Sequence, residues 1–184
     1  MIVRSRAVFG ALALSAALGA HAADAPIAAH GTLQAAFAPW DNVEELVTET
    51  IRDARRQVLV QAYLLTSKAI AATLVEACRR GLDVRVMLDA QQLAKTGASA
   101  ASELAACGIP VWLETRYQNA HNKVIVIDAD TPEATVVTGS FNFTWTAQHK
   151  NAENILIIRK NPALAGRYAA NWERHRQEAT PYQK

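Results

Sequence analysis

Strand-like and helix-like segments alternate along the first two thirds of the chain, and this alternation strongly limits the folds open to it. Residues 58–64 (VLVQAYL) and 83–89 (DVRVMLD) are continuous apolar runs of the kind found in fully buried strands. Between them lies a segment whose apolar residues repeat at helical spacing from Ile70 to Cys78. Strands that alternate with helices predict an α/β layer with a largely parallel sheet.

Capping signals and turn formers mark the ends of these segments. Asp41, followed three residues later by Glu44, predicts a capping box that opens a helix reaching about Arg56. Thr66 or Ser67 is expected to cap the next helix. The elements expected up to residue 113 are strands at 31–37, 58–64, 83–89 and 110–113, and helices at 41–56, 66–80 and 90–108.

After residue 120 the pattern changes to short, closely spaced strands. We expect antiparallel strands at 123–127, 134–138 and 154–159. A last helix at 162–178 would bury Leu164, Tyr168 and Trp172, which follow one another at four-residue spacing. The whole pattern predicts one α/β domain with a mixed sheet flanked by helices on both faces.

The N-terminus has the features of a secretory signal peptide. Residues 1–22 contain Arg4 and Arg6, then an apolar stretch shorter than the ~20 residues that span a bilayer, then small residues flanking position 21. We therefore expect a domain at 23–184 that is periplasmic or secreted, with no stable membrane anchor. Cleavage would lower the 19 Lys and Arg to 17, equal to the 17 Asp and Glu, so a nucleic-acid partner would have to meet a local basic patch.

The polar residues that follow position 120 have the spacing of a catalytic site. His121 and Lys123 lie two apart at the start of a predicted strand, so their side chains project to the same face, which Ile125 and Ile127 continue inward. Asp128 lies at an odd offset from His121, so we expect it to support the strand end or the neighbouring turn and not to touch substrate.

A second polar block follows. Ser140 and Asn142 are again two apart, after a glycine, Gly139, that permits close backbone approach. An imidazole can act as a nucleophile, a lysine can neutralise phosphoryl oxygens, and Ser and Asn add hydrogen-bond donors. Glu153 could accept a hydrogen bond from the second nitrogen of the imidazole and fix its tautomer. Such groups suit the cleavage of a phosphodiester without a metal ion.

The order His121-x-Lys123-x4-Asp128, followed by Gly139-Ser140-x-Asn142, resembles the HKD motif of the phospholipase D superfamily. The short chain with one copy of the motif is most similar to the small bacterial endonucleases of that superfamily, which resist EDTA.

The resemblance implies a metal-independent phosphodiesterase with no cofactor, in which His121 forms a phosphohistidine. It implies that Lys123, Ser140 and Asn142 hold the phosphate and that Glu153 orients the histidine. One departure is the longer connection at 129–138, which consists of turn formers and leaves the motif in phase.

The mechanism needs a second imidazole to protonate the leaving group. The resemblance implies a homodimer whose two copies of His121 share a site through a two-fold interface. His149, in a segment that looks like a loop, is the alternative within the chain; His30 in the N-terminal tail and His175 on the polar side of the last helix are placed less favourably.

Nucleic acid, DNA or RNA, is the first substrate expected from the resemblance, and a phospholipid head group is the alternative. A binding protein without turnover is a third possibility, which the complete motif disfavours. Candidate substrate contacts near the motif are Arg116, Tyr117, Trp145 and Lys150. The sequence leaves open whether Cys78 and Cys107 form a disulfide.

Overall fold

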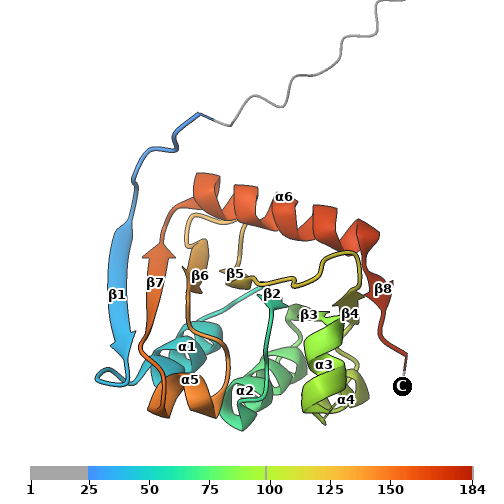
Figure 1. Cartoon of the computed structure of the whole chain (residues 1–184). Helices are drawn as coiled ribbons and strands as arrows, with labels where there is room; N and C mark the ends of the chain where they lie inside the picture. Colours follow the sequence, from blue (N-terminus) through green and yellow to red (C-terminus); the bar gives the residue numbers. More distant parts are fainter. Residues whose placement is uncertain (1–24, 98, 184) are drawn as a thin grey trace, which may run out of the picture.

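A computed structural model of the chain describes residues 25–97 and 99–183 (Figure 1). The expected signal peptide at residues 1–22 lies outside the described residues. None of the helices described in the structure combines the length and the apolar character needed to cross a bilayer.

One mixed sheet of eight strands runs through the described chain, in the order β1-β7-β6-β5-β2-β3-β4-β8. The strands are β1 (Thr32–Ala38), β2 (Gln57–Ala62), β3 (Asp83–Asp89), β4 (Val111–Glu114), β5 (Lys123–Ile127), β6 (Thr135–Gly139), β7 (Glu153–Arg159) and β8 (Thr180–Pro181). Strands β2, β3 and β4 are parallel to one another, and β5, β6, β7 and β1 join them as antiparallel neighbours. The predicted change from parallel to antiparallel pairing is confirmed.

Helices cover both faces of this sheet, as the sequence predicts (Figure 1). They are α1 (Val43–Arg52), α2 (Lys68–Arg79), α3 (Ala90–Thr96), α4 (Ser99–Ala106), α5 (Trp145–His149) and α6 (Pro162–Glu178). Helix α6 lies on one face and the other five lie on the opposite face (Figure 1). Each face has its own apolar core, and a single strand such as β5 sends alternate side chains into the two cores.

Helix α6 packs through the three residues that the sequence assigns to its inner face. Trp172 is buried, and Leu164 and Tyr168 are partly buried in the same cluster. The indole nitrogen of Trp172 donates to the carbonyl oxygen of Val60 at 2.9 Å, which ties α6 to β2. This contact satisfies the polar atom of an otherwise apolar side chain.

The start of α1 differs from the prediction by one residue. The carboxylate of Asp41 accepts a hydrogen bond from the backbone nitrogen of Phe37 at 2.8 Å, and this bond closes the turn after β1. The N-cap is therefore Asn42, whose Oδ1 accepts from the backbone nitrogen of Glu45. For α2 the cap is Ser67, one of the two candidates.

Two helix ends also differ from the prediction. Helix α1 ends at Arg52 and not near Arg56, because the carboxylate of Asp128 binds the backbone nitrogens of residues 55–57 and holds them out of the helix. The single Ala-rich helix predicted before Gly108 is two helices, α3 and α4. Helix α3 ends at Thr96, because the next residue, Gly97, has a φ of 81° that is outside the helical region.

Candidate active site

His121 and Lys123 meet at the start of β5. His121 is the second residue before the strand, and the Nζ of Lys123 lies 3.1 Å from its Nδ1. The same ammonium group donates to the carbonyl oxygen of His121 at 2.9 Å. Lys123 points to the same face as Ile125 and Ile127, which are buried against α1 to α5. The structure therefore brings together the two residues as their spacing predicts.

Burial makes the charged form of Lys123 less favourable than it is in water. The residue is only 6% exposed, and burial lowers the pKa of its ammonium group; the nearby negative charge of Glu153 partly opposes this effect. Because Glu153 begins β7, this electrostatic interaction also links the two polar blocks of the sequence across the sheet.

Ser140 and Glu153 form the second half of the constellation. The hydroxyl group of Ser140 donates to the carboxylate of Glu153 at 2.5 Å, and its oxygen accepts from the backbone nitrogen of Asn154 at 3.0 Å. The other carboxylate oxygen of Glu153 accepts from the side-chain amide of Asn151 at 2.8 Å. Both oxygens of this carboxylate therefore have partners from the loops on either side of α5.

The expected contact between Glu153 and His121 is not present in the described chain. Both oxygens of the Glu153 carboxylate bind other side chains, and the Nδ1 of His121 faces Lys123. The role of Glu153 as the group that orients His121 stays a prediction, and within the described chain its carboxylate takes other donors.

Gly139 allows β6 and β7 to approach at this point. A Cβ at this position would lie 2.3 Å from the carbonyl oxygen of Asn154, and the φ of Gly139 is 156°. That carbonyl oxygen accepts the backbone nitrogens of Ser140 and Phe141. The glycine thus permits the turn that presents Ser140, as the sequence analysis expects.

Asn142 lies between two fully buried aromatic side chains, Phe141 and Phe143. The carbonyl oxygen of Phe143 accepts from the backbone nitrogens of Thr66 and Ser67, which fixes this loop to the start of α2. The Oδ1 of Asn142 is buried and has no hydrogen-bond partner among the described residues. A buried amide oxygen without a protein donor is uncommon, and this one lies beside the motif.

Asp128 acts on the backbone of a neighbouring loop. Its two carboxylate oxygens accept from the backbone nitrogens of Arg55, Arg56 and Gln57 at 2.9, 2.8 and 2.8 Å. It lies at the end of β5 opposite to His121, which is the supporting position that its odd offset predicts. A cavity of about 460 Å³ is lined by Arg55 and Asp128 at this far end and includes none of the other motif residues.

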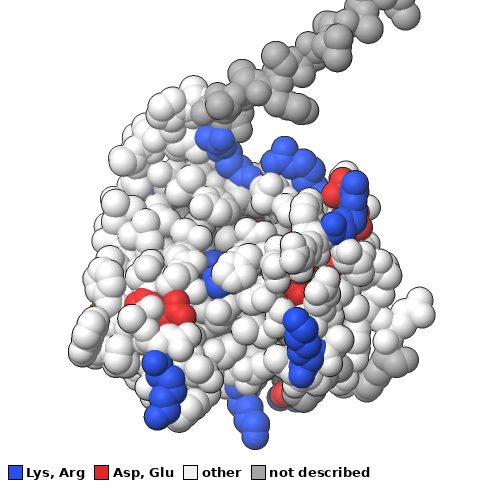
Figure 2. Space-filling view, in the orientation of Figure 1, with Lys and Arg blue, Asp and Glu red and all other residues white. Residues whose placement is uncertain are grey.

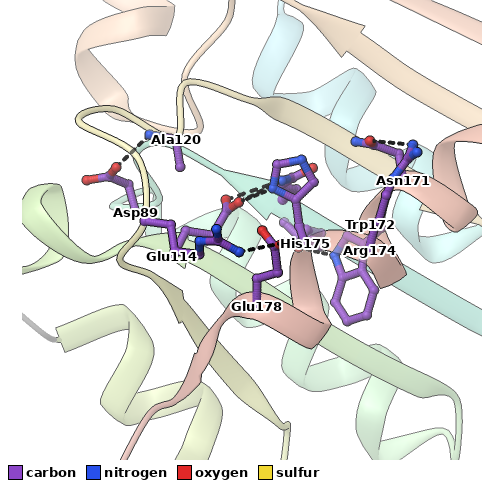
Figure 3. A network of polar contacts seen from close by, with 11 residues as sticks. Asp89, Glu114, Ala120, Asn171, Trp172, Arg174, His175 and Glu178 are labelled. Atoms are coloured by element: carbon purple, nitrogen blue, oxygen red, sulfur yellow. Dashed lines mark hydrogen bonds and ion pairs between the residues drawn. The ribbon is translucent and has the colours of Figure 1, made fainter. Parts of the chain in front are cut away.

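The remaining histidines have different surroundings. His30 is exposed in the N-terminal tail. His149 is the last residue of α5, and not part of a loop; its ring lies 4.7 Å from that of Trp145. His175 was expected on the polar side of α6, but it is partly buried, and its Nδ1 lies 2.5 Å from the carboxylate of Glu114 (Figure 3).

Tyr63 is a site residue that the sequence analysis missed. Its ring lies 4.4 Å from the ring of His121 and 4.9 Å from the Nζ of Lys123, so it contacts both members of the motif pair. Its hydroxyl group donates to Asn119, two residues before His121. One signal in the sequence could have identified it. Tyr63 lies at the C-terminal end of a predicted buried strand, where an aromatic side chain with a polar tip can reach a site at the end of the sheet.

No group of three or more His, Cys, Asp or Glu side chains in the described part of the chain is arranged to hold a metal ion. Cys78 and Cys107 are free thiols in this structure, and the Sγ of Cys78 lies 3.6 Å from the carbonyl oxygen of Cys107.

The fold and this constellation are those of the phospholipase D superfamily. A family model described as "Cardiolipin synthase, PLD-like domain" matches residues 47–176, so the chain belongs to this phospholipase D-like family.

Solved structures support the same assignment. The phospholipase D family member Nuc from Salmonella typhimurium is 31% identical to the chain, with a TM-score of 0.75. The match covers 83% of this chain and 99% of Nuc. NucT from Helicobacter pylori, at 18% identity, has the same fold with a TM-score of 0.67 over 82% of this chain and all of NucT.

Relatives with longer chains are similar to the same region. A phospholipase D from Rickettsia bellii is 37% identical over 136 residues, which cover 74% of this chain and 65% of that protein. A mitochondrial cardiolipin hydrolase from Xenopus laevis is 30% identical over 70% of this chain and 58% of its own length. The chain thus spans less than two thirds of the length of these relatives.

Proposed function

We propose that this protein is a metal-independent endonuclease that cleaves nucleic-acid phosphodiesters through a phosphohistidine on His121. The observation that carries the proposal is the contact between His121 and Lys123, with Ser140 and Glu153 on the neighbouring strands. This set places a nucleophile, a cation and hydrogen-bond donors together at the ends of strands β5, β6 and β7.

The geometry indicates how substrate would activate His121. A charged Lys123 can only donate hydrogen bonds, so its contact with Nδ1 favours the tautomer that carries a proton on Nε2. When a phosphate draws the ammonium group away, Nδ1 can carry the proton, and the lone pair of Nε2 becomes free to attack phosphorus. The bond from phosphorus to the leaving oxygen then breaks, and water later cleaves the bond between phosphorus and nitrogen.

Support for nucleic acid comes from the residues beside Ser140 and Asn142. Trp145 is 57% exposed and belongs to α5, where its ring contacts His149 and lies 5.8 Å from the Nζ of Lys150. An exposed indole with an adjacent cation suits a base and its phosphate. On the face that Figure 2 shows, Lys and Arg lie in small groups and form no continuous basic band.

The phospholipid head-group hydrolase is the second candidate. The observation in its favour is the similarity to proteins named phospholipase D and mitochondrial cardiolipin hydrolase. The match to Nuc over almost the whole of that chain supports the small, single-motif architecture on which the endonuclease proposal rests.

A homodimer is part of the proposal because the reaction needs a second imidazole. Strand β1 is an edge strand, and Leu33 and Phe37 on its α6-facing side are 65% and 50% exposed. Phe37 pairs with Asn154, directly after Glu153, so this apolar surface lies at the same end of β7 as the candidate site but on the opposite face of the sheet from Lys123. We propose that a second copy covers this surface in a two-fold dimer that pairs the two copies of His121, and the expected signal peptide would place the dimer in the periplasm.

The test is cleavage of plasmid DNA, a structured RNA and anionic phospholipid vesicles by the mature protein in excess EDTA, with His121→Ala as the control. We expect nucleic-acid cleavage that His121→Ala lacks. Hydrolysis of lipid alone would replace the endonuclease proposal with the second candidate, and activity that vanishes with EDTA would contradict both.

A further inference from the structure

The first six residues of the connection between β4 and β5, 115–120, lead directly into His121. They form no helix or strand, and their described contacts come mainly from side chains (Figure 3). The position of His121 therefore depends on what holds this connecting segment in place.

At the start of the segment, the carboxylate of Glu114 is buried and must have partners. It accepts from the side-chain amide of Gln61 at 3.2 Å and lies 2.5 Å from the Nδ1 of His175. Glu114 is the last residue of β4, Gln61 is on the central strand β2, and His175 is in the last turn of α6. Because a buried carboxylate without donors is strongly unfavourable, these contacts fix the exit from β4.

Helix α6 holds the middle of the segment as well. The guanidinium group of Arg116 pairs with the carboxylate of Glu178 at 2.5 Å. The ring of Tyr117 lies 5.3 Å from the ring of His175, with an interplanar angle of 38°. His175 thus contacts the segment twice, once through Glu114 and once through Tyr117.

The end of the segment is held by the sheet. The buried carboxylate of Asp89 accepts from the backbone nitrogen of Ala120 at 2.8 Å, next to His121. Asn119 accepts from the hydroxyl group of Tyr63, whose ring packs on His121. A shift at the α6 end would therefore be passed to the imidazole.

We propose that His175 is a positioning residue for His121 and acts through Glu114, Tyr117 and the segment 115–120. It does not touch the reacting atoms. The inference rests on the proposed function, and the packing of Trp172 on β2 keeps α6 in place independently of His175. Removal of His175 should therefore loosen the segment without releasing the helix.

The test compares three variants with wild type on one phosphodiester substrate. His175→Ala should lower kcat by about ten- to a hundredfold with KM nearly unchanged, since a misplaced reacting group costs rate at this scale. His175→Gln keeps a donor for Glu114 and should recover most of kcat. Arg174→Ala is the matched control, because this exposed side chain donates to Asn171 on the same helix.

A second measurement is independent of turnover. Nitrogen–proton correlation spectra of the imidazole rings should show a shifted His121 signal in His175→Ala and an unchanged one in Arg174→Ala. If His175→Ala does not fold, Tyr117→Ala serves in its place, with a smaller loss of kcat and the same displaced signal.

The outcomes separate the two proposals. An inactive wild type, with the His121 signal still displaced by His175→Ala, would remove the proposed function and leave the positioning inference standing. An unchanged kcat and an unchanged His121 signal in folded His175→Ala would overturn the inference. So would a folded His175→Gln variant with a normal His121 signal that is as inactive as His175→Ala, because the loss of kcat would then not follow the position of His121.

Discussion

Asp128 should matter more for stability than for chemistry, and graded substitutions can separate the two effects. In the native structure its carboxylate accepts three backbone N–H groups, from Arg55, Arg56 and Gln57. Hydrogen bonds to a charged group contribute about 1.5–3 kcal/mol each. Partial exposure of this loop and non-additivity reduce the sum, so we expect Asp128→Ala to lower the free energy of unfolding by about 3–5 kcal/mol.

Asp128→Asn should cost less. The amide oxygen can still accept from Arg56 and Gln57, while the NH₂ group would face the backbone N–H of Arg55. One lost bond predicts a decrease of about 1.5–3 kcal/mol. Asn also tolerates the left-handed conformation of this position, where φ is 51°, better than Ala does.

Urea denaturation gives the free energies, and cleavage at a temperature where every variant is folded gives kcat. Because Asp128 lies at the far end of β5 from His121, folded Asp128→Asn should keep kcat within about fivefold of wild type. If Asp128→Asn had normal stability and no activity, the assignment of Asp128 as a structural residue would be refuted.

Three further predictions follow from the site and its surroundings. Burial lowers the pKa of Lys123, so cleavage should begin to decline at a pH lower than 10.5, the ordinary pKa of a lysine. Between the lowered pKa and 10.5 the unfolded chain binds more protons than the folded chain does. The free energy of unfolding should therefore rise with pH in this range in wild type and not in Lys123→Met. Gly139→Ala places a Cβ against the carbonyl oxygen of Asn154, so both kcat and the melting temperature should fall; an intact melting temperature with full activity would show that the strands can separate at little cost. Phe37→Asp should give a monomer by light scattering that has lost most activity, whereas an active monomer would contradict the shared site.

The sequence predicts most of the fold because local patterns carry the information. The buried run at 58–64 and the amphipathic segment before Gly81 each have one favourable conformation, and the structure confirms them as β2 and α2. The prediction for the start of α1 failed because Asp41 bonds back to Phe37, a contact that depends on the path of the turn.

In the candidate site, too, local contacts could be predicted from the sequence and contacts between distant elements could not. The pairing of His121 with Lys123 could be predicted, since strand geometry alone puts them on one face. The partners of Glu153 and the contacts of His175 could not, because they join elements far apart in the sequence. Tyr63 reaches His121 across the β2–β5 pairing, which only the strand order reveals.

The central claim is that His121 attacks phosphorus, and trapping the covalent intermediate tests it most directly. Mature protein would be mixed with a short labelled phosphodiester in EDTA, stopped within the first turnover by alkaline denaturant, digested and analysed by mass spectrometry. A phosphoryl adduct is expected on the peptide that contains His121, and none in His121→Ala. Turnover without such an adduct, or an adduct on another residue, would contradict it.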